Sequence, residues 1–333
     1  MDLTSAAIII SNNPVQIDNC LSHVANQTVP FSRILVVAWG QENLKQQVIQ
    51  KAVSVISNAE IIDPDNDTRL ENNRNKAISH LIEKPTDRVA FLDDDTLIEN
   101  NWLEVMRCAA MQDGDKISHA TVVKFNSQPF CIQSAGHCLD NASPLDLAYG
   151  KCINFPITAI PLCPCGNSAY IPWRALVDIH DRDQEIWDPD FDQWVTCFDF
   201  GLKLQLCGYG CKLVPSAFAT HQGYLDKSIR NQKLCKNKVM KQLRSRLLLY
   251  FKFYPSPDRE SATDQLNKSL DRWRINGYPH AEAEIKGEKL VELFCSARIG
   301  AKKLAKTKSK IWLELMSNLV SSQRRNLLFG NKY

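Results

Sequence analysis

Short apolar runs alternate with helical patterns over the first third of this 333-residue chain. Ala6–Ile10 and Ile34–Ala38 are apolar and rich in β-branched residues, as buried parallel strands are, and Ile17–Val24 between them has helical spacing. The alternation continues with helix Gln41–Ile56, strand Glu60–Ile62, helix Asn72–Ile82 and strand Arg88–Leu92. It predicts an α/β fold with a doubly wound sheet, which binds ligands at the carboxyl ends of its strands.

The pattern changes in the second third of the chain. Thr121–Cys165 is rich in strand and turn residues, so we expect the sheet to become mixed there. The other elements expected are helix Glu99–Ala110, a strand and helix over Asn167–Ile179, helix Phe198–Cys207 and a last strand from Lys212 to Pro215. Beyond Gly223 the pattern is helical and basic. The chain therefore divides into a sheet-bearing domain, residues 1–223, and a basic helical region, residues 224–333.

Composition places the chain among globular proteins. Hydrophobic residues make up 44% and charged residues 23%, which permits a buried core and argues against widespread disorder. The apolar run Ala6–Ile10 is far shorter than the ~20 residues that span a bilayer, and no cationic segment precedes it. We therefore predict neither a signal peptide nor a transmembrane helix, and a cytoplasmic location.

The chain has twelve cysteines, which raises the question of a metal site. Without a secretion signal, reduced thiols are the default. Cys163 and Cys165 are separated by one residue, and Cys131, His137, Cys138 and Cys152 precede them. Zinc ligands usually come in pairs with two to four residues between them, which favours ordinary thiols and leaves a structural zinc site as the alternative.

Three consecutive aspartates follow the strand predicted at Arg88–Leu92. Asp93, Asp94 and Asp95 repel one another unless a cation lies among them, and Mg²⁺ or Mn²⁺ prefers such oxygen ligands, often shared with substrate phosphates. The alternative is a solvated turn with an acidic helix start. A second informative segment, Trp187–Gly223, holds Asp199 on a helix and His221 after the last strand. A lone histidine is more often structural, but the aspartate triplet makes a ligand role plausible.

Taken together, these segments resemble the inverting glycosyltransferases of family 2, especially the bacterial rhamnosyltransferase-like branch. The blocks that carry the resemblance are IIISNN, NNRNKAI, FLDDDTLIENNW, CGNSAYIPWRALVDI, WDPDFDQWV and FDFGLKLQLCGYGCKLVPSAFATH. The resemblance implies a GT-A nucleotide-diphospho-sugar transferase fold with a doubly wound mixed sheet and a helical C-terminal extension. It also implies a nucleotide-sugar donor, Mn²⁺ or Mg²⁺, and a glycan or lipid-linked glycan acceptor, as in surface polysaccharide synthesis.

The resemblance also assigns roles on the donor side. It places Asn12 and Arg74 near the nucleotide, although Arg74 is alternatively an ordinary surface arginine of its helix. Asp93 lies near the ribose or base and shares in the metal site. Asp95 is the metal ligand that bridges to the diphosphate, and His221 is an additional ligand.

On the acceptor side, Gly166 and Asn167 match the family's acceptor segment, where glycine permits close approach of a sugar. Trp187 and Trp194 are suited to stacking on sugar faces, and packing in the core explains either of them equally well.

The chain departs from the family pattern at three places. Thr196 and Cys197 stand where the family has the acidic pair that includes the catalytic base. An inverting transfer needs a carboxylate to take the acceptor proton, and Asp199 is our first candidate and Asp192 the second. The family's aspartate after the second strand corresponds to Ala38 or Trp39, which implies a different contact to the nucleotide base. Lys203 replaces an arginine.

The basic stretch Ser228–Pro255 leaves several alternatives open. It resembles the helix that follows the catalytic domain in this branch, where it covers the acceptor site or contacts an anionic membrane surface, and packing on the catalytic domain is the simpler explanation. The substitutions at Ala38, Thr196 and Cys197 also permit a weakened homologue that binds a nucleotide sugar or glycan in an assembly complex. Nucleic-acid binding is not expected, because no motif for it is present.

Overall fold

The computed structural model describes residues 3–64, 67–140, 143–191, 195–223, 233–253 and 314–324. The chain divides into two compact units. The main unit comprises Met1–Cys138, Asp146–Pro189 and Phe200–Leu225, and the second unit comprises Leu139–Leu145, Asp190–Asp199 and Asp226–Tyr333. The predicted boundary after residue 223 stays a prediction, since these units are discontinuous in sequence.

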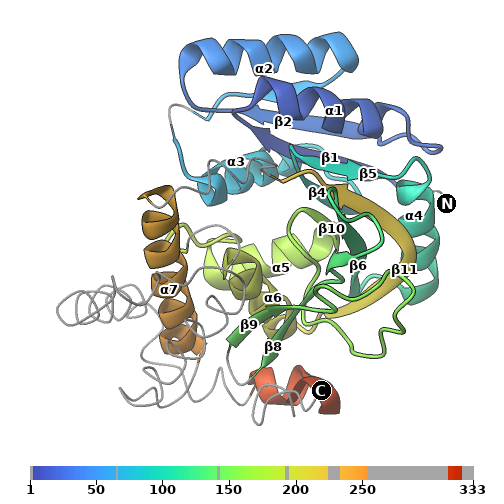
Figure 1. Cartoon of the computed structure of the whole chain (residues 1–333), viewed down its shortest axis with the longest axis vertical. Helices are drawn as coiled ribbons and strands as arrows, with labels where there is room; N and C mark the ends of the chain where they lie inside the picture. Colours follow the sequence, from blue (N-terminus) through green and yellow to red (C-terminus); the bar gives the residue numbers. More distant parts are fainter. Residues whose placement is uncertain are drawn as a thin grey trace. The chain divides into compact units, whose positions relative to one another are not determined.

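Helices and strands alternate through the first half of the chain (Figure 1), as predicted. They are β1 (Ser5–Ser11), α1 (Pro14–Ala25), β2 (Arg33–Ala38), α2 (Glu42–Val55), β3 (Glu60–Ile62), α3 (Leu70–Ile82), β4 (Arg88–Asp93), β5 (Thr96–Ile98) and α4 (Trp102–Asp113). The later elements are β6 (Ile117–Phe125), β7 (Ile132–Ser134), β8 (His137–Asp140), β9 (Ser143–Asp146), β10 (Ser168–Pro172), α5 (Trp173–Asp183), α6 (Thr196–Leu206), β11 (Gly210–His221) and α7 (Lys233–Phe253).

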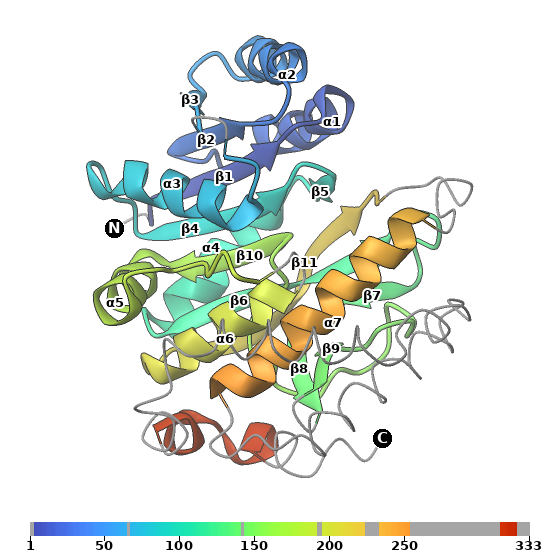
Figure 2. The same ribbon diagram turned by 90° about the vertical axis from the view of Figure 1, so that its left-hand side faces the viewer.

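The main sheet is mixed, and its topology agrees with the predicted GT-A fold. Within the described part of the chain it has nine strands, eight of them in the order β3-β2-β1-β4-β10-β6-β11-β5, with β7 paired to β6. Strands β1 to β4 pair in parallel, whereas β10 lies antiparallel to both β4 and β6. Figure 2 follows the strands from β3 through β1 and β4 to β6. The parallel half corresponds to the βα repeats read from the sequence, and the antiparallel strand comes from the segment expected to change the sheet.

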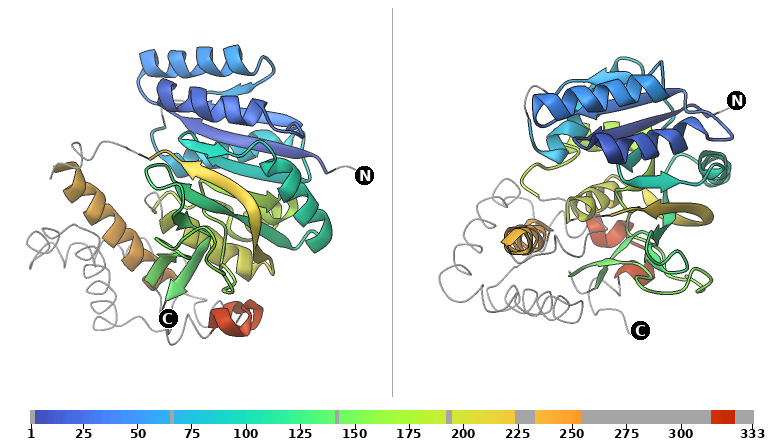
Figure 3. Two further views of the ribbon diagram at one scale, coloured as in Figure 1. Left: turned by 45° about the vertical axis from the view of Figure 1, so that its right-hand side comes forward. Right: turned by 45° about the horizontal axis from the view of Figure 1, so that its top comes forward.

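Alternate residues of the central strands face two helical layers. Ala7 and Ile9 of β1 belong to a buried core with α1, α2 and α4, whereas Ile8 faces the opposite side, as the two-residue period of a strand requires. On that opposite side, Phe91 of β4 packs edge-on against Trp187. Figures 1 and 3 show α1 and α2 side by side along the same part of the sheet. This two-sided covering explains why the parallel strands are apolar throughout.

The last strand, β11, is longer than the sequence indicated. We expected it to end at Pro215, but it continues to His221 and is visibly curved (Figure 3, left, yellow). Its pairing with β6 shifts register between Leu213 and Phe218, and Pro215 lies in this irregular stretch, where a residue without an N–H is tolerated. The short strand β5 was also not predicted, and α4 begins at Trp102 rather than at Glu99.

In the second unit, α7 is the main described helix. Leu247, Leu248 and Phe251 are almost completely buried, so this face of α7 is packed rather than solvated. Packing of the helix on the catalytic domain stays a prediction. Across the described ranges, no helix combines the length and apolarity that crossing a membrane requires. Apart from α7 and residues 314–324, the predicted helical region from residue 224 onward lies outside the described residues.

Candidate active site

The aspartate triplet lies at the carboxyl edge of the parallel strands. Asp93 is the last residue of β4 and pairs in register with Ile10 of β1. Its backbone N–H donates to the carbonyl of Asn167, which immediately precedes β10, at 3.2 Å. Asp94 and Asp95 form the turn between β4 and β5. The triplet is therefore held by strands on both sides, at the edge where α/β sheets bind ligands.

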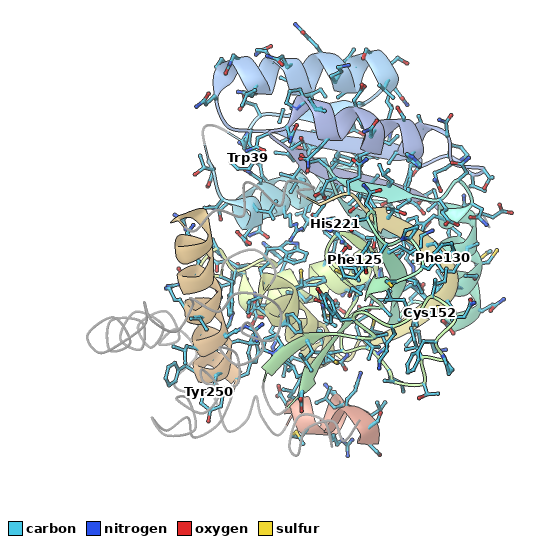
Figure 4. The ribbon with its side chains drawn as sticks, viewed as in Figure 1. Trp39, Phe125, Phe130, Cys152, His221 and Tyr250 are labelled. Atoms are coloured by element: carbon cyan, nitrogen blue, oxygen red, sulfur yellow. The ribbon has the colours of Figure 1, made fainter. Side chains whose placement is uncertain are left out.

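His221 reaches the triplet because the end of β11 pairs antiparallel with β5, with His221 opposite Thr96. The N–H of Gln222 donates to the carbonyl of Asp95 at 2.8 Å, and His221 Nε2 lies 3.1 Å from Asp95 Oδ1. Figure 4 labels His221 at the end of β11. Ligand atoms of Asp93, Asp95 and His221 all lie within 4.8 Å of one another. The structure thus brings together the three residues that the sequence suggested as metal ligands.

Burial and mutual repulsion make these carboxylates unusual. Burial raises the pKa of Asp93 above its ordinary value, with Arg74 acting in the opposite direction and Asp95 adding to the rise. The pKa of Asp94 rises to about 7, again mainly through burial, although a hydrogen bond from Ser11 lowers it. Crowded carboxylates of this kind are an unfavourable arrangement that a bound cation relieves.

The imidazole of His221 shows the complementary effect. Burial alone would lower its pKa, but the hydrogen bond and charge of Asp95, together with Asp93, outweigh burial and raise it. Two carboxylate oxygens and one imidazole nitrogen form a donor set that suits Mn²⁺ and Mg²⁺ coordinated jointly with phosphate oxygens. The residues present therefore fit a divalent metal.

Arg74 faces the triplet from α3. It is almost completely buried, and its Nη2 lies 3.1 Å from Asp93 Oδ1. The guanidinium carbon also lies 4.5 Å from the centre of the Trp187 ring, in a cation–π contact. Because the side chain is buried and contacts both Asp93 and Trp187, the alternative of an ordinary surface arginine is wrong.

Trp187 supports Arg74 from the core. Its ring is 1% exposed and stacks on Phe200 with 4.4 Å between ring centres. The side-chain amide of Asn75 donates to the Trp187 carbonyl at 2.7 Å and accepts from its N–H at 2.9 Å. This enclosure favours core packing, one of the two explanations for Trp187. Stacking of its ring on an acceptor sugar would require the core to open.

Asn12 lies beside the turn that follows β2. This turn contains Gly40 with φ +97°, and a Cβ at that glycine would come within 3.3 Å of the Asn12 Cβ. Trp39, the residue before it, is partly buried and is labelled in Figure 4 at the end of β2. Asn12 and Trp39 thus follow two neighbouring parallel strands and share the carboxyl edge with Asp93.

The predicted acceptor residues Gly166 and Asn167 are both buried, and the carbonyl of Asn167 accepts the hydrogen bond from the Asp93 N–H. Asn167 is 6% exposed and its side-chain oxygen accepts from the Ser168 hydroxyl at 3.2 Å. Their position beside the triplet agrees with a role close to the donor, and their contact with an acceptor stays a prediction.

Of the two candidates for the catalytic base, only Asp199 lies among the described residues. Asp199 of α6 is fully buried and accepts a hydrogen bond from Lys252 of α7 at 2.5 Å, within the second unit. Asp192, like Trp194, lies outside the described residues. Lys203, the replacement for the family's arginine, is buried and donates to the carbonyls of Glu185 and Ile186 at 3.0 and 3.3 Å, so it fixes the loop before Trp187.

Two residues of the site were missed from the sequence. Ser11, at the end of β1, donates to Asp94 Oδ2 at 2.5 Å, and its position after an apolar strand was a usable signal. Gln133 of β7 lies with its amide nitrogen 3.0 Å from His221 Nδ1. Nothing in the sequence around Gln133 indicates this contact, because it depends on the pairing of β7 with β6.

Comparison with known proteins agrees with this fold. Residues 5–155, somewhat less than half of the chain, match the family model described as glycosyl transferase family 2. No curated protein matches. Among solved structures, the fold is similar to that of GalNAc-T7 with UDP, GalNAc and Mn²⁺, at 14% identity and a TM-score of 0.58, with 95% of this chain and 57% of that chain covered.

A second similar structure is S. aureus TarS 1–349, at 13% identity and a TM-score of 0.55, with 98% of this chain and 90% of that chain covered. This chain spans little more than half of the GalNAc-T7 chain and 55% of a longer TarS structure. At these identities the structures show the fold alone, which is GT-A. Together with the family match, the fold supports a family 2 glycosyltransferase, whereas the rhamnosyltransferase-like branch stays a prediction.

Proposed function

From a family 2 match on a GT-A fold, we propose that this chain transfers a sugar from a nucleotide-diphosphate donor to an acceptor hydroxyl, with inversion at the anomeric carbon. The observation that carries the proposal is the cluster of Asp93, Asp95 and His221 at the carboxyl edge of the sheet. A chain that only needed a stable fold would gain little from two partly buried carboxylates and a histidine crowded together in that position.

Asp93, Asp95 and His221 would hold Mn²⁺ or Mg²⁺. When bound, the metal supplies positive charge that neutralises the departing diphosphate. Neighbouring groups keep the ligands and their turn in place. Arg74 donates a hydrogen bond to Asp93, and Gln133 contacts His221. Ser11 donates a hydrogen bond to Asp94, which lies between the two ligating aspartates. Ligands that are oriented in this way lose little freedom when the donor binds.

The donor nucleotide would lie across the ends of β1 and β2. Asn12 offers an amide beside Gly40, and Arg74 adds charge next to Asp93. The family's aspartate for the base is missing, and the partly buried ring of Trp39 offers a stacking face at the same edge. We assign the base contact to Trp39. Stacking is tolerant of base identity, so the preference among nucleotides would come from other contacts.

The acceptor proton needs a carboxylate, and Asp199 remains the first candidate. The ammonium group of Lys252 donates to Oδ1 of this carboxylate and occupies the oxygen that an acceptor hydroxyl would need. Catalysis by Asp199 therefore requires Lys252 to release it when the acceptor binds. Asp192 is the second candidate, and it applies if Asp199 proves to be structural.

A weakened homologue that binds a nucleotide sugar or glycan in an assembly complex is the alternative function. It is favoured by Thr196 and Cys197, which leave no acid at the family's usual base position. Only the first hypothesis predicts turnover, whereas donor binding without turnover, or glycan binding alone, agrees with the second.

The wider role is proposed from the resemblance alone. We expect a glycan or lipid-linked glycan acceptor in surface polysaccharide synthesis, with the protein in the cytoplasm or peripherally at the inner face of the membrane. Basic residues of α7 are the part of the described chain that would contribute to such a contact.

The testing experiment measures thermal stabilisation of the full chain by nucleotide sugars with and without Mn²⁺. The GalNAc-T7 structure holds UDP and Mn²⁺, so UDP-sugars come first, followed by GDP-, dTDP- and CMP-sugars. A rise in melting temperature that requires one particular nucleotide together with the metal supports the donor site, because a ligand that binds the folded state stabilises it. Asp95→Ala should abolish that shift. An unchanged shift in this variant would refute the metal site.

Turnover is measured on the same samples as release of nucleotide diphosphate with a panel of acceptors. Release that depends on an acceptor identifies an enzyme. If the protein binds the nucleotide sugar but releases no nucleotide diphosphate with any acceptor of the panel, the weakened homologue is favoured.

A further inference from the structure

A second cluster of metal-binding side chains shares no residue with the aspartate triplet. It consists of His137 in β8, Asp146 at the end of β9, and Cys165 before β10. His137 Nδ1 lies 3.0 Å from Asp146 Oδ1, and one ligand atom from each of the three residues lies within 4.8 Å of the others. His137 is fully buried, Cys165 is 8% exposed, and all three belong to the main unit.

Backbone hydrogen bonds hold the three ligands in place. The N–H of His137 donates to the carbonyl of Cys163 at 2.9 Å, and the N–H of Leu162 donates back to the carbonyl of His137 at 2.7 Å. The N–H of Leu147 donates to the carbonyl of Gly136 at 2.9 Å. Three separate segments are thus joined next to the side chains in question, so the ligand set exists in the folded backbone before any ion binds.

The position of Gly136 shows how tightly these segments approach. Its φ is +95°, and a Cβ there would lie 2.8 Å from the Pro161 side chain and 3.0 Å from the carbonyl oxygen of Cys163. Only glycine satisfies both conditions. The turn that precedes His137 is therefore built to bring β8 against the segment that ends at Cys165.

We propose that His137, Asp146 and Cys165 bind one Zn²⁺ ion. Imidazole nitrogen, carboxylate oxygen and thiolate sulfur are the ligands that zinc takes, and the thiolate selects zinc over Mn²⁺ and Mg²⁺. In a tetrahedral zinc site the ligand atoms lie about 3.3–3.8 Å apart, so the His137–Asp146 pair at 3.0 Å must open slightly while the whole set stays within its present limit of 4.8 Å. Water completes the fourth position, because the partly exposed Asp146 leaves one side of the cluster near solvent.

The neighbouring thiol of Cys163 does not serve as the fourth ligand. A Cβ on Gly201 of α6 would lie 2.5 Å from Cys163 Sγ, which shows that this sulfur packs directly on the helix backbone. The two cysteines of the C-x-C pair therefore have different roles, with Cys163 packed on α6 and Cys165 beside His137. The zinc ion would link β8 and β9 to the entrance of β10, where the acceptor-side residues Gly166 and Asn167 begin.

The test is the metal content of the full-length protein, purified without chelators and dialysed against metal-free buffer, measured by inductively coupled plasma mass spectrometry. We expect about one zinc per chain in the wild type and in Cys108→Ser, which removes an exposed thiol from α4. Cys165→Ser should lose the zinc. Asp95→Ala should retain it, and this variant separates the proposed site from zinc held at the aspartate triplet.

Two further measurements cover the case in which Cys165→Ser does not fold. Asp146→Asn removes a partly exposed ligand and should lower zinc content at unchanged circular dichroism. Replacement of zinc by Co²⁺ in the wild type should produce a thiolate-to-cobalt charge-transfer band in the near ultraviolet. Two results would overturn the proposal: no zinc in the wild type, or the same zinc content in the wild type and in the Cys165 and Asp146 variants. The cluster would then be a hydrogen-bonded His–Asp pair beside a buried thiol.

Discussion

The side-chain amide of Gln133 lies 3.0 Å from Nδ1 of His221, on the opposite side of the ring from Asp95. The amide oxygen is also within reach, at 3.1 Å. If Nδ1 carries the proton and donates it to that oxygen, Nε2 is left as an acceptor that faces the carboxylates. Gln133 therefore sets which nitrogen of His221 is available to a metal.

The first prediction concerns Gln133→Ala. Removal of a residue that orients a metal ligand typically lowers metal affinity about 10- to 100-fold, and we expect a loss in this range for Mn²⁺ in the presence of nucleotide diphosphate. Isothermal titration calorimetry measures it. Thermal stability without metal should change little, since Gln133 is partly exposed. Equal Mn²⁺ affinity in the variant and the wild type would mean that His221 is oriented by Asp95 and the backbone alone.

The second prediction separates the two explanations of Trp187. Because the ring is buried against Phe91, Phe200 and Arg74, Trp187→Ala should lower the free energy of unfolding by ~3–5 kcal/mol. Trp187→Phe keeps part of the packing and should lose less. Urea unfolding measures both. Trp173→Ala, at a less buried tryptophan of α5, is the control. A stable Trp187→Ala variant with a raised KM for acceptor would instead support sugar stacking.

The third prediction concerns the buried pair of Asp199 and Lys252. Removal of one partner leaves an uncompensated buried charge, so Lys252→Met should destabilise the protein by ~3–5 kcal/mol. Asp199→Asn keeps the shape of the side chain and should retain donor binding while transfer is lost. Nucleotide binding and product release are measured in parallel. If Asp199→Asn still transfers at the normal rate, the aspartate is structural and Asp192 becomes the base to test.

The fourth prediction is a dependence of stability on pH through His119. This fully buried histidine of β6 has a pKa lowered by burial to about 4, against an ordinary 6.5, despite its hydrogen bond to Asp113. Between these values the unfolded chain binds a proton that the folded chain does not, so stability falls as the pH falls through this window. From pH 7 to pH 5 the loss is roughly 2 kcal/mol.

Urea unfolding at the two pH values checks this effect. His119→Gln should show a smaller loss than the wild type over the same interval, because it has no group that titrates there. His180→Gln, at an exposed histidine of α5, should behave as the wild type does. An identical loss in the His119 variant would assign the pH dependence to other groups.

Local patterns were sufficient to predict most of the fold. The apolar runs of β1, β2 and β4 and the helices between them were located within a few residues, because each is encoded by its own hydrophobic period. The two strand errors have one cause. β5 pairs with the final part of β11, and that part of β11 pairs with both β5 and β6, so these strands depend on contacts between distant segments that no local pattern encodes.

The residues of the site also fall into those that a local pattern predicted and those that depend on distant contacts. Asp93 and Asp95 were predictable because they follow a strand of the parallel sheet directly. The role of Trp187 as a support for Arg74 was not, since a tryptophan in a loop gives no sign of which ring or guanidinium it will meet. Ser11 had a usable signal, whereas Gln133 depends on the position of a short edge strand.

The part of β11 beyond its irregular stretch also determines at which step of folding the metal ligands come together. Asp93 and Asp95 are in place once β4 joins β1, but His221 arrives only when the final residues of β11 pair with β5. The pairing of β5 with β11 closes a longer stretch of chain than the pairing of β1 with β4, so its loop-closure entropy is larger. A chain in which β11 is not paired with β5 has the carboxylates without the imidazole, and we expect tight metal binding to report that this pairing has formed.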